Sequence, residues 1–307
     1  MKKIRALLAL FLCLMILTAP ALAADETTAA TPDDASQSAD TSAEAAVSAA
    51  PEYHANAKAA LLIDLNTGRT IFEQNADEQV YPASLTKIMT CLLALENGNL
   101  SDVVTITDEA YADLVSGSST ADLQVGEQLR LEDLLYCMMV ESGNEAANAV
   151  AEHIGGTIED FVQMMNERAY ELGCTHTHFM NPHGLHNESH YTTARDLSLI
   201  VQAALKSENF RTITNTAEYT LPATNLSDER VLKTTNMLIF QNSGNRYYYP
   251  KAIGIKTGYT TPAGRCVISA AKSSGMYLLG IICGAETTVL ETGDIQMESF
   301  QECINLF

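Results

Sequence analysis

Ser84 and Lys87 stand three residues apart in a segment whose apolar spacing predicts a helix over 84–97. On a helix, this spacing puts both side chains on one face, one turn apart. A lysine whose pKa is lowered by burial and by a nearby cation can take the proton of a serine hydroxyl. A serine in the first helical turn also lies at the positive end of the helix dipole, which favours a developing oxyanion. The pair could therefore drive acyl transfer through a serine nucleophile.

The Ser–Lys spacing is a weak signal on its own. Ser269 and Lys272 repeat it within a segment that reads as a strand. In a strand, positions i and i+3 point to opposite faces of the sheet, so these two side chains cannot act together. The pattern carries chemistry only where a helix supports it.

Two further motifs stand downstream. Ser142-Gly143-Asn144 falls at a predicted break between helices, where a hydroxyl and an amide can face a cleft, although helix capping explains the same residues. Lys256-Thr257-Gly258 falls on a predicted strand, where the lysine can lower the pKa of Lys87 and the glycine lets a ligand approach the backbone. Alone, each is weak. In the order SxxK, SxN, KTG they form the signature of β-lactamases and penicillin-binding proteins.

The elements that must position these motifs are strands near both ends of the segment 59–306 and helices that lie mostly between them. Strands are predicted at 59–64, 70–74, 252–257, 265–272 and 276–284, and helices at 84–97, 131–141, 145–154, 157–172, 193–206 and 293–306. This arrangement predicts an α+β fold, in which one antiparallel sheet has helices on both faces.

The chain resembles the low-molecular-mass D-alanyl-D-alanine carboxypeptidases, serine-type penicillin-binding proteins of peptidase family S11. The resemblance covers 53–307 and is carried by the segments 81–90, 126–156, 179–185 (FMNPHGL), 190–197 (HYTTARDL) and 254–260. It implies a β-lactamase/transpeptidase-like fold and a hydrolase that removes the terminal D-alanine from peptidoglycan stem peptides without a cofactor. It also implies a role in peptidoglycan biosynthesis and cell shape, with β-lactams as inhibitors.

The resemblance implies catalytic roles for three residues. Ser84 would attack the carbonyl between the two D-alanines and become acylated. Lys87 would be the general base, and Ser142 would relay a proton to the leaving amine.

Substrate binding falls, on the same resemblance, to five residues. Asn144 would hold the acyl amide, and Lys256 and Thr257 would receive the terminal carboxylate. Gly258 would allow the substrate to approach the strand closely. The backbone N–H of Tyr259 would form the oxyanion hole together with that of the nucleophile.

Some positions depart from the family pattern. Glu145 follows the SxN motif where the family usually has aspartate. The stretch 285–294 lacks the arginine that commonly helps to grip the substrate carboxylate, and Glu291 stands near its expected place. The sequence also ends without the second, β-rich domain and amphipathic anchor of many relatives, so we expect a protein that is released or held only by an uncleaved signal.

The first 52 residues do not have the pattern of a folded domain. Residues 1–23 combine a basic start, an apolar run and Ala21-Leu22-Ala23, as in a secretory signal peptide. Residues 24–52 are acidic and rich in Ala, Ser and Thr, as in a disordered linker. We therefore expect secretion to the cell-wall side of the membrane, with the membrane contacted only transiently, and one peptidase domain over 53–307.

The charge of the chain argues against some partners. The formal net charge is −20 and becomes −23 without residues 1–23, which hold three cations and no acid. Nucleic acid is therefore not an expected partner. Attraction to an anionic wall or membrane surface is not expected either.

Histidine and cysteine side chains raise two further questions. Five histidines between residues 176 and 190 suggest a zinc site, but three of them lie in segments that resemble a metal-free family, so we favour structural histidines and predict no metal. Cys266 and Cys283 should face each other across a hairpin that closes at Ser274-Gly275. Two packed thiols are favoured there over a disulfide, which remains open.

Three alternative functions use the same fold. A β-lactamase would need a dedicated glutamate for deacylation, and no convincing ExxLN-like segment lies between the second and third motifs. A non-catalytic wall-binding module would have no reason to keep all the motif residues. A D,D-endopeptidase or transpeptidase would use identical residues, so the sequence does not separate it from a carboxypeptidase.

Overall fold

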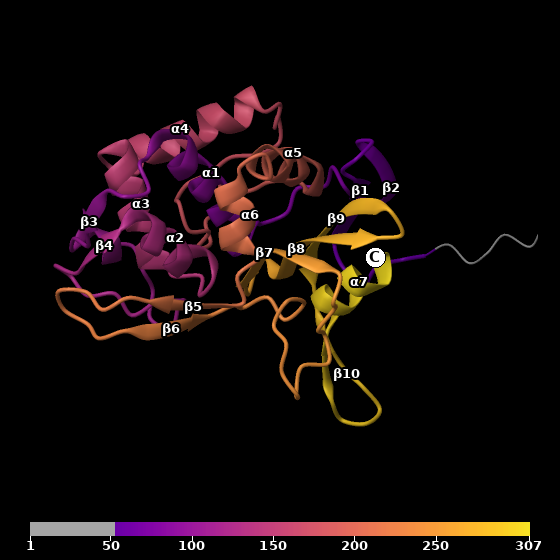
Figure 1. Ribbon diagram of the computed structural model, residues 1–307. Helices are drawn as coiled ribbons and strands as arrows, with labels where there is room; N and C mark the ends of the chain where they lie inside the picture. The colour runs from indigo at the N-terminus through magenta and orange to yellow at the C-terminus, as the bar shows by residue number, and fades with distance from the viewer. Residues whose placement is uncertain (1–52) are drawn as a thin grey trace, which may run out of the picture. The chain divides into compact units, whose positions relative to one another are not determined.

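The computed structural model describes residues 53–307 (Figure 1). The predicted signal peptide and linker lie outside the described residues. Within 53–307, no helix is both long enough and apolar enough to cross a membrane.

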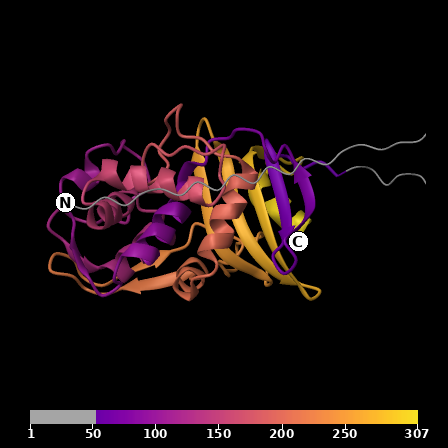
Figure 2. The same ribbon diagram turned by 90° about the horizontal axis from the view of Figure 1, so that it is seen from above.

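A five-stranded antiparallel sheet forms one layer of the fold, as predicted. Its strands are β1 (Ala59–Asp64), β2 (Arg69–Gln74), β7 (Ala252–Thr260), β8 (Gly264–Ser273) and β9 (Met276–Ala285). They lie in the order β2-β1-β9-β8-β7, so β7, which carries the KTG motif, is an edge strand (Figures 1 and 2). One edge of the sheet is therefore free to face a ligand.

Helices cover both faces of the sheet, because the inner strands are continuously apolar and their successive side chains point to opposite faces. On one face, Leu61 and Ile268 belong to the main core, which α1 (Lys87–Asn97), α5 (Ala194–Ala204) and α6 (Glu208–Thr214) complete. On the other face, Ala60 and Val267 belong to a smaller core with Phe300 of α7 (Glu298–Leu306). The two layers of core confirm the predicted α+β architecture.

The helical part lies beside the sheet (Figure 2). It contains α2 (Leu131–Met139), α3 (Asn144–Gly155) and α4 (Ile158–Glu171), with the short 3₁₀ helix η2 (Glu109–Tyr111) packed on α3. Two small hairpins flank it, formed by β3 (Val103–Thr105) with β4 (Gln128–Arg130) and by β5 (Glu218–Leu221) with β6 (Arg230–Lys233). Thr157 and Thr193 cap α4 and α5 as predicted, because each hydroxyl accepts the main-chain N–H three residues later.

Two local predictions were wrong, and one helix was missed. The segment 84–97 is not one helix from Ser84, because a 3₁₀ turn, η1 (Ala83–Thr86), precedes α1. The last helix begins at Glu298 instead of Gly293, since β10 (Thr287–Val289) and β11 (Ile295–Met297) form a hairpin that turns near Gly293 at φ +84°. Helix α6, which Ser207 caps, was not predicted.

The register of β8 and β9 also differs at one end from the prediction. Ser273 faces Met276, but a bulge between Arg265 and Val267 shifts the pairing beside Cys266. Cys266 and Cys283 are both free and buried. The favoured interpretation of two packed thiols is therefore confirmed.

Candidate active site

Ser84 lies in a tightly constrained turn at the start of η1. Ala83, the residue before it, has φ +47°, a conformation that L-residues rarely adopt. The hydroxyl of Thr86 donates to the Ala83 carbonyl over 2.8 Å, and Gly184 lies so close that a Cβ there would be 1.8 Å from the same oxygen. Packing from a distant segment therefore holds the turn and leaves Ser84 half-buried at the surface of a pocket.

The Lys87 side chain is fully buried beneath this turn. Its Nζ lies 3.2 Å from Ser84 Oγ, 2.6 Å from Asn144 Oδ1 and 2.8 Å from the His183 carbonyl oxygen. A neutral amine has two N–H groups and one lone pair. With the N–H groups donated to Asn144 and His183, the lone pair is left for the proton of Ser84.

Both buried lysines of the site have lowered pKa values. Burial, and then the charge of Lys256, lowers the pKa of Lys87 well below its usual range, and Glu145 opposes this effect. Burial lowers the pKa of Lys256 to about 7. Lys87 is therefore suited to be a neutral base near neutral pH, whereas Lys256 can carry a charge there.

Ser142 connects the second motif to the third. It has φ +69° at the break between α2 and α3, and its Oγ accepts a hydrogen bond from Lys256 Nζ over 3.0 Å. The following Gly143 is packed against Ala121, where an added Cβ would lie 3.1 Å from the alanine Cβ. This break, predicted as a place where polar side chains face a cleft, brings Ser142 and Asn144 to the same pocket as Ser84.

The edge strand β7 passes close to Ser84. A Cβ on Gly258 would lie 2.9 Å from the Ser84 backbone nitrogen, so only glycine fits without a shift. Thr257 Oγ1 lies 2.5 Å from Thr235 Oγ1 in the pocket. Tyr259 follows with its side chain exposed. The predicted site residues therefore converge: all of them except the two buried lysines line one pocket of about 420 Å³.

The segment 117–127 forms another wall of the pocket, through its residues 117–119. Glu145, which is fully buried, accepts hydrogen bonds from the Ala121 N–H over 2.5 Å and the Leu123 N–H over 3.5 Å. Asn144 N donates to the Ser119 carbonyl over 3.0 Å. The glutamate that departs from the family pattern thus ties this wall to the start of α3.

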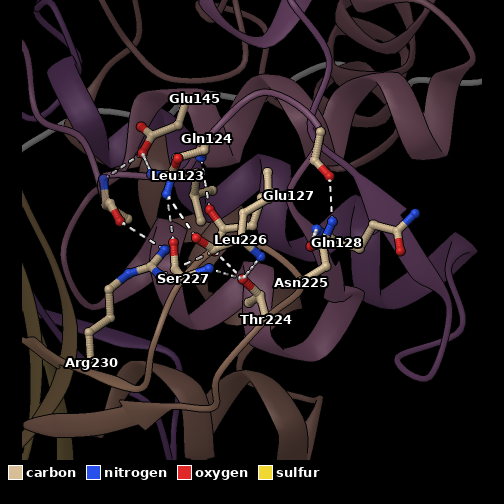
Figure 3. A network of polar contacts seen from close by, with 12 residues as sticks. Leu123, Gln124, Glu127, Gln128, Glu145, Thr224, Asn225, Leu226, Ser227 and Arg230 are labelled. Atoms are coloured by element: carbon tan, nitrogen blue, oxygen red, sulfur yellow. Dashed lines mark hydrogen bonds and ion pairs between the residues drawn. The ribbon is translucent and has the colours of Figure 1, made fainter.

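The same segment is also tied to the β5–β6 hairpin (Figure 3). Glu127, which is fully buried, accepts a hydrogen bond from Thr224 over 2.9 Å and pairs with Arg230 over 3.1 Å. Gln124 Nε2 donates to Ser227 Oγ over 2.8 Å. These contacts join residues about a hundred positions apart, and they fix one side of the pocket without belonging to any motif.

Several pocket residues were missed from the sequence. Thr235 beside Thr257, Arg265 beside Tyr259, and the Ser118-Ser119 pair all line the pocket. None of them belongs to a short motif. The position of Arg265 one strand away from the KTG motif was the only available signal.

The histidines between residues 176 and 190 have structural contacts. His190 is buried, its Nε2 lies 2.9 Å from Thr86 Oγ1, and burial lowers its pKa to about 3. His183 Nε2 lies 2.9 Å from Asp113 Oδ2, and burial lowers its pKa. His178 Nδ1 lies 2.7 Å from the Ser189 carbonyl oxygen. His190 thus contacts the turn that contains Ser84, the main chain of His183 contacts Lys87, and His178 holds its own segment together.

Comparison with known proteins identifies the family. The sequence model of the D-alanyl-D-alanine carboxypeptidases, peptidase family S11, matches residues 43–287. The chain belongs to this family. Its members with similar sequences include the D-alanyl-D-alanine carboxypeptidase DacF of Bacillus subtilis strain 168, which is 38% identical over 236 residues. DacA of Escherichia coli K12 is 35% identical over 241 residues.

The two matches cover most of this chain but only part of the relatives. They span 75% and 76% of this chain, and 58% and 57% of the length of DacF and DacA, respectively. Solved structures match more completely. The DD-transpeptidase of Streptomyces K15 is 32% identical with a TM-score of 0.72, and the match covers 84% of this chain and 98% of that one. A D-alanyl-D-alanine carboxypeptidase of Mycobacterium tuberculosis H37Rv matches with a TM-score of 0.72 and 27% identity, over 84% of this chain and 93% of that chain. These likenesses confirm the predicted fold of DD-peptidases.

Proposed function

We propose that this S11 family member is a serine D-Ala-D-Ala carboxypeptidase that trims peptidoglycan stem peptides through an acyl-enzyme on Ser84. The observation that carries the proposal is the environment of Lys87: a buried amine of lowered pKa, with two acceptors for its N–H groups and Ser84 Oγ 3.2 Å away. This is the arrangement that a serine needs to lose its proton to a neutral base.

Acylation begins when Ser84 Oγ attacks the carbonyl carbon of the penultimate D-alanine and Lys87 takes the hydroxyl proton. The negative charge moves to the carbonyl oxygen, which accepts hydrogen bonds from the backbone N–H groups of Ser84 and Tyr259. The close approach of Gly258 to the Ser84 nitrogen supports this pairing of strand and turn.

The tetrahedral intermediate then breaks its C–N bond. The leaving amine of the terminal D-alanine takes a proton from the Ser142 hydroxyl. The proton that Lys87 took from Ser84 then restores this hydroxyl, so Lys87 is neutral again, while Lys256 Nζ, 3.0 Å from Ser142 Oγ, orients the hydroxyl. D-alanine departs and leaves an ester on Ser84. A water attacks the carbonyl carbon of this ester and gives its proton to Lys87. The ester C–O bond then breaks, the shortened peptide leaves with a new carboxyl group, and Lys87 returns the proton to Ser84 Oγ.

Substrate binding involves the remaining motif residues. Lys256 and Thr257 receive the terminal carboxylate, while Asn144 holds the acyl amide as well as Lys87. β-Lactams, which mimic the terminal dipeptide, acylate the same serine. The predicted signal peptide and the wall-directed substrate both support a location outside the cytoplasmic membrane, on its cell-wall side.

Intact-mass measurement after brief exposure to benzylpenicillin tests the proposal. Wild type should gain the mass of a single penicilloyl group that persists, and it should also release D-alanine from a pentapeptide. Ser84→Ala should do neither. Ser269→Ala is the matched control, because Ser269 has the same Ser–Lys spacing on β8 and should leave both activities intact.

Two results would contradict the proposal. Fast turnover of penicillin without a lasting adduct would make the protein a β-lactamase. If no adduct formed and the penicillin stayed intact, the protein would not perform acylation. It would then be a non-catalytic wall-binding protein.

A further inference from the structure

Arg265, at the start of β8, is a half-buried cation without an acidic partner among residues 53–307. No hydrogen bond or ion pair to its guanidinium is present in this part of the chain; the group lies 5.1 Å from the ring centroid of Tyr259. Other arginines of the described chain, such as Arg168 and Arg195, pair with carboxylates. Arg265 instead lines the pocket that contains Ser84 and Thr257.

The register of β7 and β8 places Arg265 along the path of the substrate. Gly258 pairs with Cys266, and Tyr259 pairs with Arg265. If the terminal carboxylate is at Thr257 and the scissile carbonyl is beside Gly258, the peptide continues toward Tyr259. An extended peptide advances about 3.3 Å per residue, as a strand does, so the two stay in step along β7. The residue before the two D-alanines, the third of the stem peptide, therefore lies beside Tyr259 and Arg265.

A second pocket of about 380 Å³ extends from this point, and Tyr259 and Arg265 line both pockets. Its other charged residues are Lys58 and Glu286. The stem of Lys58 covers Gly284, where an added Cβ would be 2.8 Å from three Lys58 carbons. Glu286 forms no ion pair with either cation in the described chain. The pocket thus offers two cations and one carboxylate in a protein whose net charge is −20.

We infer that Arg265 selects stem peptides whose third residue ends in a free carboxylate. Meso-diaminopimelate has such a side chain, which ends in both a carboxylate and an ammonium group. Its carboxylate would bind Arg265 and Lys58, and its ammonium group would face Glu286. A lysine at the third position offers only an ammonium group to a pocket with two cations. The inference rests on the proposed function and specifies its substrate class.

The test compares D-alanine release from three pentapeptides that differ only at the third residue. They contain meso-diaminopimelate, its side-chain carboxamide, or L-lysine. Because a hydrogen bond to a charged group contributes about 1.5–3 kcal/mol, wild type should prefer the free carboxylate by about tenfold or more in kcat/KM. Arg265→Gln should bring the three values to within about threefold of one another by lowering the first.

Arg246→Gln is the matched control. Arg246 is exposed, lies at the same 5.1 Å from the ring centroid of its neighbour Tyr247, and is outside both pockets. This variant should keep the full preference for the free carboxylate. The preference of wild type should also weaken at high salt, since it depends on charge near the surface.

Acylation by benzylpenicillin separates the outcomes. Penicillin has a carboxylate that mimics the terminal one but no third residue. If Arg265→Gln slowed penicillin acylation and all three peptides equally, Arg265 would bind the terminal carboxylate, and the inference would be wrong. Equal rates of wild type on the three peptides would also overturn it, while leaving the proposed function in place. Absence of both acylation and D-alanine release would remove the proposed function and the inference with it.

Discussion

Lys256 Nζ donates a hydrogen bond to Ser142 Oγ over 3.0 Å, and both side chains are almost fully buried. The bond joins an edge strand to a helix break 114 residues earlier in the chain. Lys256 also donates to the Thr257 carbonyl over 3.0 Å, so its position depends on β7 as well. The same lysine lowers the pKa of Lys87 by its charge. A change at Lys256 should therefore affect carboxylate binding, proton relay and the basicity of Lys87 together.

The two lysines should give kcat/KM for D-alanine release a bell-shaped dependence on pH. As the proposed base, Lys87 acts only when neutral, so the rate should rise as pH increases through its lowered pKa. As the proposed carboxylate ligand, Lys256 binds only when charged, so the rate should fall as pH rises through its pKa of about 7 in the free enzyme. In the pH profile of kcat, the alkaline limb should move to higher pH, because the bound substrate carboxylate stabilises the charged form of Lys256.

Two substitutions at Lys256 should change the limbs of this profile differently. Lys256→Arg keeps a charge that does not titrate in this range, so the alkaline limb should disappear even if the maximal rate falls. Lys256→Met removes the charge, so the pKa of Lys87 and the acid limb should move upward. An alkaline limb that stays unchanged in Lys256→Arg would assign it to another group.

The sequence could predict the motifs and most of the elements that support them. Strands β1, β8 and β9 contain continuous runs of buried, mostly apolar residues, and α4 and α5 have threonine caps, so both local signals agree with the final fold. The hairpin of β10 and β11 lacked such a signal. Val289 and Ile295 are exposed there, and no apolar face distinguished two short strands from a helix.

The walls of the site were less predictable than its motifs. The segment 117–127 has no regular pattern, and contacts to Glu145 and to the β5–β6 hairpin position it. The bulge beside Cys266 shifts the register of β8, so counting from the turn misplaces this end of the hairpin by one residue. Such long-range contacts do not follow from local spacing.

Glu145 should prove to be a positioning residue for the pocket wall. Glu145→Ala leaves the buried N–H of Ala121 without an acceptor, which costs about 1–3 kcal/mol of unfolding free energy. Because the segment 117–127 is then held less firmly, its cleavage by protease should be faster and kcat/KM should fall. Glu145→Gln is the conservative control, since its amide oxygen can accept the same hydrogen bond. Wild-type kinetics and protease resistance in Glu145→Ala would contradict this role.

Thr86 should control the geometry of the nucleophile turn. His190 Nδ1 accepts the Met180 N–H over 3.3 Å, so in the neutral ring Nε2 carries the proton and donates to Thr86 Oγ1 over 2.9 Å. Thr86 in turn donates to the Ala83 carbonyl. Thr86→Val preserves the shape of the side chain but removes both hydrogen bonds of the Thr86 hydroxyl. It should therefore lower the unfolding free energy by about 1–3 kcal/mol. Because the strained turn before Ser84 loses the hydrogen bond from Thr86 to the Ala83 carbonyl, penicillin acylation should slow by about tenfold or more.

Thr214→Val separates this effect from a general loss of stability. Thr214 is buried, and its hydroxyl also donates to a main-chain carbonyl over 2.8 Å, in α6. The Thr214→Val variant should lose a similar amount of unfolding free energy, measured by urea unfolding, yet penicillin should acylate it at the wild-type rate. If both variants slowed acylation equally, the effect would come from destabilisation rather than from the turn. If Thr86→Val were acylated as fast as wild type, the packing of Gly184 against Ala83 would be sufficient to hold Ser84 in place.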